Sequence, residues 1–309
     1  MGGVTQTAET TPETGQLTLR DVVAVLERMH PLDTAQSWDR VGLVAGDLDQ
    51  PVSRIHLAVD PTLAVIEEAR AAGADLIITH HPLLLRGIHS VATTTAKGVA
   101  VTELLVNDIA LYCAHTNADV ADPGVGQALA DACGLTRTEA LEITEGQELG
   151  RVGDLPAPTT LAEFARRLHE NLPRTAGGIR VAGPADGAVR RVAVLGGAGD
   201  SSFDAVRAAD ADVYVTADLR HHPALEAREE ASLTGGTPYL IDAGHFASES
   251  LWLPGLASRL MAELAGAAAR LEVHVSQVRT DPWEFVLGAS GPEQDPLSGP
   301  HTNDAGDLA

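Results

Sequence analysis

The segment Asp75-Leu-Ile-Ile-Thr-His-His-Pro82 joins a short apolar run to two adjacent histidines and a proline. Its β-branched, apolar residues are typical of a buried strand, and a proline ends such a strand. We therefore expect His80 and His81 at the carboxyl end of that strand, where open α/β sheets hold their ligands. Adjacent residues on a strand point to opposite faces, so both rings can serve one site only if the chain turns out of the strand there.

Strands and helices are expected to alternate around this segment. A strand at 55–59, a helix at 63–72 and a strand at 76–79 form a βαβ unit, and a helix near 97–107 then leads to a strand at 109–114. The pattern predicts an α/β fold.

The same pattern occurs a second time in the chain. Residues 54–79 end in Gly-Ala-Asp-Leu-Ile-Ile-Thr, and residues 191–216 end in Asp-Ala-Asp-Val-Tyr-Val-Thr. A His-His-Pro triplet follows the first copy directly and follows the second, at 221–223, after a four-residue insertion. This shared order favours an internal duplication, which gives two related α/β lobes facing each other across a cleft.

The composition of the chain suggests five segments. They are a disordered leader at 1–16, a first α/β lobe at 17–137, a junction with connecting elements at 138–187, a second α/β lobe at 188–287 and a disordered tail at 288–309. The N-terminus lacks the features of a signal peptide, and no apolar run is long enough to span a membrane. Cys113 and Cys133 fit structural thiols of a reducing compartment, so we expect a cytoplasmic protein.

The charge of the chain bears on its partners. A net charge of −22, from 43 acidic and 21 basic residues, argues against a nucleic-acid partner because phosphate binding needs clustered Lys and Arg. The acidic excess is explained by solubility alone, although some carboxylates could be metal ligands.

Polar residues follow three of the apolar strands: His80 with His81, His115 to Asp119, and His245 with Glu249. Imidazole and carboxylate together suit zinc, manganese, iron or cobalt, whereas calcium prefers oxygen ligands throughout. On a helix, His245 and Glu249 would leave one face and could share an ion. Taken alone, His80 and His81 could be a strand end satisfied by backbone, Asp119 a helix-capping or turn residue, and His245 with Glu249 a solvated or salt-bridged helix face. Their common position after strands favours metal binding.

Five motifs together resemble the Nif-three-like dinuclear metal-binding family, whose members are also called GTP cyclohydrolase type 2 homologues. The motifs are Trp38-Asp-Arg-Val-Gly-Leu43, Ala74-Asp-Leu-Ile-Ile-Thr-His-His-Pro82, His115-Thr-Asn-Ala-Asp119, Thr216-Ala-Asp-Leu-Arg-His-His222 and Asp242-Ala-Gly-His-Phe-Ala-Ser-Glu249. The resemblance covers residues 17–283. It implies a duplicated α/β fold, two divalent transition-metal ions in the cleft between the lobes, and a ring-like homohexamer.

The resemblance also implies a set of ligands. They are His80, His81, Asp119, His245 and Glu249, with Glu249 as the bridging carboxylate. One departure is Ala217-Asp218, where relatives more often have Gly-Glu. No long insertion separates the two lobes, so we expect the extra domain of some family members to be absent.

Two functions fit this sequence. Paired ions can activate a bridging water, which predicts a metal-dependent hydrolase acting on a small phosphorylated or heterocyclic molecule. His115, Asp218 and His222 are candidates for proton transfer or for orienting the ligands. No phosphate loop or guanine-reading pattern independently supports GTP as the substrate. The alternative is a non-catalytic ring that stores, delivers or senses metal or scaffolds a partner.

Overall fold

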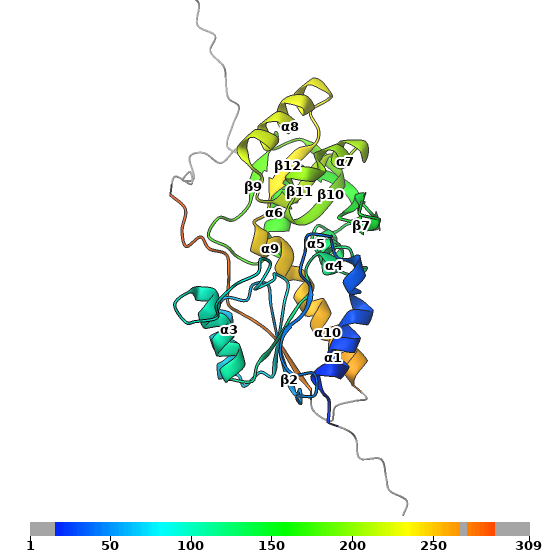
Figure 1. The fold of residues 1–309 in the computed structure, drawn as a ribbon. Helices are drawn as coiled ribbons and strands as arrows, with labels where there is room; N and C mark the ends of the chain where they lie inside the picture. The colour runs from blue at the N-terminus through cyan, green and yellow to red at the C-terminus, as the bar shows by residue number, and fades with distance from the viewer. Residues whose placement is uncertain (1–15, 266–270, 288–309) are drawn as a thin grey trace, which may run out of the picture. The chain divides into compact units, whose positions relative to one another are not determined.

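The computed structural model describes residues 16–265 and 271–287, and the chain divides into two compact units, each built on its own mixed sheet (Figure 1). Of the described residues, the first unit contains 16–129, 142–150, 249–265 and 271–280, and the second contains 130–141, 151–248 and 281–287. Most of the predicted leader (residues 1–15) and the whole predicted tail (288–309) lie outside the described residues.

The first sheet has five strands in the order β1-β4-β3-β2-β13. β2 (Arg54–Ala58), β3 (Leu76–Thr79), β4 (Ala110–Cys113) and β13 (Glu272–Val275) are parallel, and β1 (Gly42–Ala45) pairs antiparallel with β4. Every residue of β3 and β4 is buried, as expected for parallel strands covered on both faces. The predicted α/β class and the strands of the first βαβ unit are confirmed.

Helices cover both faces of the first sheet, with α3 on one side and α1 and α10 on the other (Figure 1). These helices are α1 (Leu19–Met29), α2 (Leu63–Ala71), α3 (Ala96–Val106) and α10 (Leu253–Leu264). Thr18 caps α1 in a capping box: its side chain accepts from the Asp21 N–H, and the Asp21 carboxylate accepts from the Thr18 N–H. Ile66, Ile77, Leu104 and Leu111 share one apolar core between α2, α3 and the sheet.

Shorter elements complete the first unit. They are η1 (Leu32–Thr34), α4 (Thr116–Asp119), β6 (Glu142–Thr144), β7 (Gln147–Leu149) and η3 (Ser250–Trp252), while α5 (Val125–Ala132) and α9 (His245–Glu249) each run across a boundary between the units.

The second sheet has six strands in the order β5-β8-β10-β11-β12-β9. β10 (Ala188–Ala198), β11 (Val213–Ala217) and β12 (Tyr239–Asp242) are parallel, and β5 (Thr136–Glu139), β8 (Arg151–Thr160) and β9 (Arg180–Ala182) join as antiparallel neighbours. Its helices are α6 (Leu161–Asn171), η2 (Asp200–Ser202), α7 (Phe203–Ala208) and α8 (His221–Leu233). The segment predicted as a junction, 138–187, therefore contributes β8 and β9 to this sheet, while its residues 142–150 belong to the first unit.

The parallel cores of the two units follow the same order, β2-α2-β3-α3-β4 and β10-α7-β11-α8-β12. Asp75 Oδ2 accepts from two backbone N–H groups at the start of β2, at 2.7 and 2.9 Å. Asp212 Oδ2 accepts from the N–H groups of Arg190 and Arg191 within β10, both at 2.8 Å. The Asp75 N–H also donates to the Arg54 carbonyl oxygen, and the Asp212 N–H donates to the Arg191 carbonyl oxygen. The two sequence copies thus form the same local structure.

This correspondence changes one sequence interpretation. Counted from the two aspartates, His80 and His81 match Ala217 and Asp218, whereas the second His-His-Pro triplet opens helix α8. The two His-His-Pro triplets are therefore not structural counterparts.

The end of the chain also differs from expectation. Residues near 271–278 were expected in the second lobe, but β13 pairs in parallel with β2 of the first sheet, with His274 opposite His56. The pairing covers the free edge of β2, which would otherwise expose unpaired backbone groups. Among the described residues, no helix is both long and apolar enough to cross a membrane.

Candidate metal centre

Histidines leave the ends of two adjacent strands of the first unit. His80 and His81 follow β3, and His115 follows β4 as the residue before α4. The Thr79 hydroxyl donates to the His81 carbonyl at 2.8 Å, and the chain turns out of the strand there. The rings of His80 and His81 come to 5.1 Å between centroids, so the predicted turn brings both to one place.

Both rings of the pair are held through Nδ1. His80 Nδ1 lies 3.0 Å from the Ala114 carbonyl oxygen, and His81 Nδ1 lies 2.6 Å from Asp60 Oδ1. A carbonyl oxygen only accepts, so Nδ1 of His80 carries the hydrogen and Nε2 is the atom that a metal could bind. Metal-ligating histidines are typically oriented in this way.

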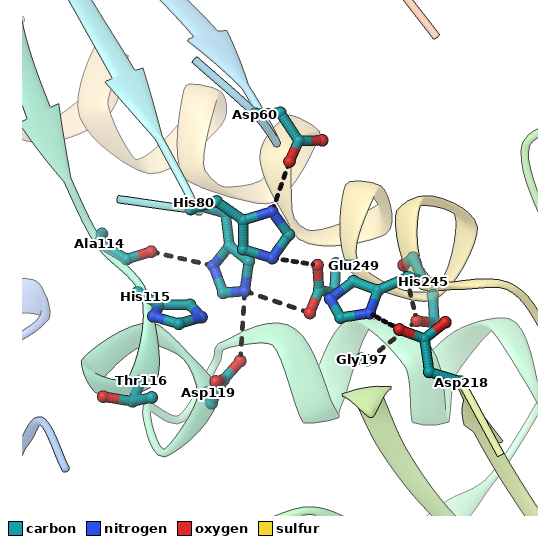
Figure 2. Close-up of polar contacts among 12 residues, drawn as sticks. Asp60, His80, Ala114, His115, Thr116, Asp119, Gly197, Asp218, His245 and Glu249 are labelled. Atoms are coloured by element: carbon teal, nitrogen blue, oxygen red, sulfur yellow. Dashed lines mark hydrogen bonds and ion pairs between the residues drawn. The ribbon is translucent and has the colours of Figure 1, made fainter. Parts of the chain in front are cut away.

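Two carboxylates face the same ring nitrogen (Figure 2). Asp119, at the end of α4, and Glu249, at the end of α9, each place an oxygen 3.6 Å from His80 Nε2. The other oxygen of Glu249 lies 3.0 Å from His81 Nε2. His80 is fully buried, and among the described residues its Nε2 has no hydrogen-bond partner.

These distances suit a shared ion better than hydrogen bonds. A separation of 3.6 Å is too long for a good hydrogen bond. Two nitrogen or oxygen ligands at about 2.1 Å from a tetrahedral ion are about 3.4 Å apart. The buried nitrogen without a partner and the imidazole and carboxylate donors around it therefore fit a transition metal.

The carboxylates of the cluster also favour a positive charge beside them. Burial opposes a charge on His81, but hydrogen bonds to Asp60 and Glu249 outweigh it and raise the His81 pKa to about 10. Burial likewise opposes a charge on His80, and Glu249 and Asp119 raise its pKa. Burial raises the pKa of Asp119. Protons thus supply in the metal-free protein the positive charge that a bound cation would provide.

His115 is the third imidazole of the cluster. One ring nitrogen each from His80, His81 and His115 lies within 4.8 Å of the others. His115 Nδ1 is 3.0 Å from Asp39 Oδ1, so Nε2 is the ring nitrogen of His115 that could bind a metal. Burial raises the Asp39 pKa, but hydrogen bonds from His115 and Thr116 outweigh it and lower the pKa below its usual value.

Sequence reasoning missed the two aspartates that hold these rings. Asp39 lies in the motif 38–43, to which the resemblance assigns no ligand, and none of the five motifs contains Asp60. The available signal for Asp60 is its position just after β2, at the same sheet edge as the histidines. Its other oxygen accepts from the Thr280 hydroxyl.

The remaining predicted residues lie in the second unit. His245 begins α9, one helical turn before Glu249, and its Nδ1 lies 2.8 Å from Asp218 Oδ2. Asp218 therefore contacts Nδ1 of His245 in the same way that Asp60 contacts Nδ1 of His81. His222 is exposed in the first turn of α8, where its ring contacts His221 at 5.2 Å between centroids.

Fold and site together define a class: an α/β protein of two units with mixed sheets that carries a buried histidine and carboxylate cluster suited to a metal ion. The family described as Duf34/NIF3 (NGG1p interacting factor 3) matches residues 17–282, and the chain belongs to this family. The resemblance drawn from the five motifs is confirmed.

Individual relatives agree with this assignment. The chain is 48% identical to a Streptomyces coelicolor protein named GTP cyclohydrolase 1 type 2 homolog, over 92% of this chain and 99% of the relative. A Mycobacterium bovis protein of the same name is 35% identical, over 86% of this chain and 97% of the relative. That alignment spans 376 positions, more than the 309 residues of this chain, so the relative contains residues that this chain lacks.

A solved structure shows the same fold. The Bacillus cereus protein related to NIF3 superposes with a TM-score of 0.79 at 26% identity, covering 88% of this chain and all of that one.

Proposed function

We propose that this protein is a dinuclear metal-dependent hydrolase. The proposed ligands are His80, His81, Asp119, His245 and Glu249, with Glu249 as the bridge. The observation that carries the proposal is the buried Nε2 of His80, which has no hydrogen-bond partner among the described residues and lies 3.6 Å from carboxylates of both Asp119 and Glu249.

The chain's own residues would orient the ligands and handle protons. When bound, paired divalent ions lower the pKa of water and polarise the group under attack. Asp60 fixes the His81 ring and Asp218 fixes the His245 ring, which sets the direction of their Nε2 atoms. Asp39 holds Nδ1 of His115, so Nε2 of that ring can take up or release a proton during hydrolysis.

A small anionic substrate is supported by the second unit. It contains a cavity of about 430 Å³, within the size range of small-molecule sites, lined by Arg180, Arg220 and Arg228 beside apolar residues such as Leu225 and Leu240. Arg180 is paired with Asp242, which also lines the cavity, and Arg220 is paired with Asp200. Planar guanidinium groups beside an apolar wall suit a phosphorylated heterocycle. The relatives' name, GTP cyclohydrolase 1 type 2 homolog, points to the same substrate class.

Assembly and ancestry belong to the same proposal. The matching aspartate contacts of Asp75 and Asp212 support an internal duplication as the origin of the two units. A homohexamer is the assembly that the family resemblance implies, and sedimentation of the purified protein tests it.

The alternative is a metal-binding protein without catalysis. Glu249 is only 4% exposed and His80 is fully buried, and a site closed by protein ligands suits storage or sensing better than turnover.

Turnover separates the two. Protein loaded in turn with zinc, manganese, iron or cobalt is assayed against phosphoesters, nucleotides and cyclic amides. Glu249→Gln, which keeps the shape of the side chain, should abolish activity with the circular dichroism spectrum unchanged. Glu229→Gln removes an exposed carboxylate on α8 and should retain full activity. If the wild type shows no turnover with any of the four metals, the non-catalytic alternative is supported instead.

A further inference from the structure

A second group of metal-ligating side chains lies in the first unit, on residues that the candidate metal centre does not use. His56 on β2 and His274 on β13 are register partners on neighbouring parallel strands, so their side chains leave the same face of the sheet. Glu68 of α2 reaches this pair.

Both histidines direct Nε2 toward the Glu68 carboxylate. His56 Nε2 lies 2.9 Å from one carboxylate oxygen, and His274 Nε2 lies 4.0 Å from the other. The rings are 4.9 Å apart between centroids and tilted by 33°, and one donor atom from each residue lies within 4.8 Å of the others. The spacing of about 3.4 Å between two ligands of a tetrahedral ion falls between 2.9 and 4.0 Å, so small side-chain shifts suffice.

The carboxylate is itself held in place. The Ser276 hydroxyl donates to the Glu68 oxygen that faces His56, and the Gln277 N–H donates to the other oxygen at 3.4 Å. These donors fix the orientation of a ligand in the way that outer partners do at metal sites.

The group is buried on one side and open on the other. The His56 side chain is 1% exposed, whereas that of His274 is 53% exposed. An ion bound there would be reachable from solvent and would keep a coordination position for water. Burial lowers the His56 pKa, so the ring is neutral near pH 7 and able to bind metal.

We propose that His56, Glu68 and His274 bind one divalent transition-metal ion, for which zinc is the best fit, through both Nε2 atoms and the carboxylate. The ion would tie the edge strand β13 to β2 and α2. It is separate from the two ions of the proposed hydrolase.

One feature limits the affinity. A metal on His56 Nε2 leaves the ring proton on Nδ1, which is buried and has no hydrogen-bond partner among the described residues. Ligands that lack such an outer partner bind metal 10- to 100-fold more weakly, so this ion should dissociate more readily than those of a site with complete support.

The test uses a chain in which the candidate metal centre has lost two of its five proposed ligands, the double variant His80→Ala, Glu249→Gln; each three-residue group of potential ligands at that centre loses a member. After treatment with chelator and dialysis, it is titrated with Zn²⁺, and with Co²⁺ to follow ligand-field absorption, and bound metal is counted. We expect one ion per chain, lost when His274→Ala is added. His274 is half exposed, so this change should leave the fold intact. His169→Ala, which removes an exposed histidine of α6, should leave the ion in place.

The outcomes distinguish this site from the proposed hydrolase. No ion in the double variant, or an ion that persists after both His274→Ala and Glu68→Gln, overturns the inference. Wild-type protein that binds a single ion, lost with His274→Ala but kept in the double variant, supports the inference and contradicts the dinuclear hydrolase.

Discussion

Replacing Asp60 by Asn should make the stability of the metal-free protein depend less on pH. Asn keeps an oxygen for the 2.6 Å hydrogen bond to His81 but removes the negative charge. The His81 pKa rises from 6.5 to about 10 on folding, and at 1.36 kcal/mol per pKa unit this corresponds to about 5 kcal/mol. Glu249 shares that stabilisation, and solvent screens a side chain that is 22% exposed, so we assign Asp60 about 1–2 kcal/mol.

The sign of the effect follows from the direction of the shift. Because the folded pKa of His81 is raised, its stabilisation is complete below pH 6.5 and is lost as the pH rises through about 10. The Asp60 pKa is lowered despite burial, by the hydrogen bond from His81, so Asp60 stays ionised over this range. Wild type and Asp60→Asn should therefore differ most near pH 6 and converge above pH 10.

Urea unfolding in the presence of chelator, followed by tryptophan fluorescence at several pH values, measures this difference. Trp38 and Trp252 both lie in the first unit and report on its unfolding. Thr280→Val is the matched control, because it removes the hydroxyl that donates to Asp60 without changing charge, and its effect should be nearly constant with pH. A wild-type-to-Asn difference that stays constant or grows toward pH 10 would refute the reasoning.

Two further predictions concern the units and the thiols. Asp75→Ala and Asp212→Ala should each destabilise their own unit by about 1 kcal/mol in urea unfolding, because each leaves two backbone N–H groups without their carboxylate partner. An effect in only one unit contradicts the matching roles. Burial raises the pKa of Cys113 and Cys133, so neither thiol should react with Ellman's reagent at pH 8 until the protein is unfolded, and prompt labelling of the folded protein would be the contrary result.

Most strands of the first sheet could be predicted from the local sequence pattern. The apolar runs of β3 and β4 are buried on both faces, so their composition alone marks them as strands. Pairing between strands that are far apart in the sequence has no such local signal. The pairing of β13 with β2, and the antiparallel strands β8 and β9 beside the second core, depend on tertiary packing that no local window contains.

The sequence singled out histidines and carboxylates that cluster in the structure, but not the aspartates that hold the rings. His80, His81 and Asp119 follow strands whose carboxyl ends meet at one sheet edge. Glu249 is marked by its spacing of four residues from His245, which places both side chains on one face of a helix. Asp39 and Asp60 act through hydrogen bonds to ring nitrogens, and such contacts have no fixed sequence spacing. His56 and His274 come together only through the register of two distant strands, so sequence periodicity gave no sign of them.

A crystal structure of the metal-loaded protein, with anomalous diffraction recorded at the metal's absorption edge, tests the central claim most directly. At the candidate metal centre we predict anomalous peaks for two ions, in addition to the one proposed at His56, Glu68 and His274. His80 Nε2, His81 Nε2, Asp119 and Glu249 should be among the ligands at about 2.0–2.2 Å, with His245 completing the set. Absence of a peak at His80, or a coordination shell that omits Glu249, would contradict the proposed dinuclear centre.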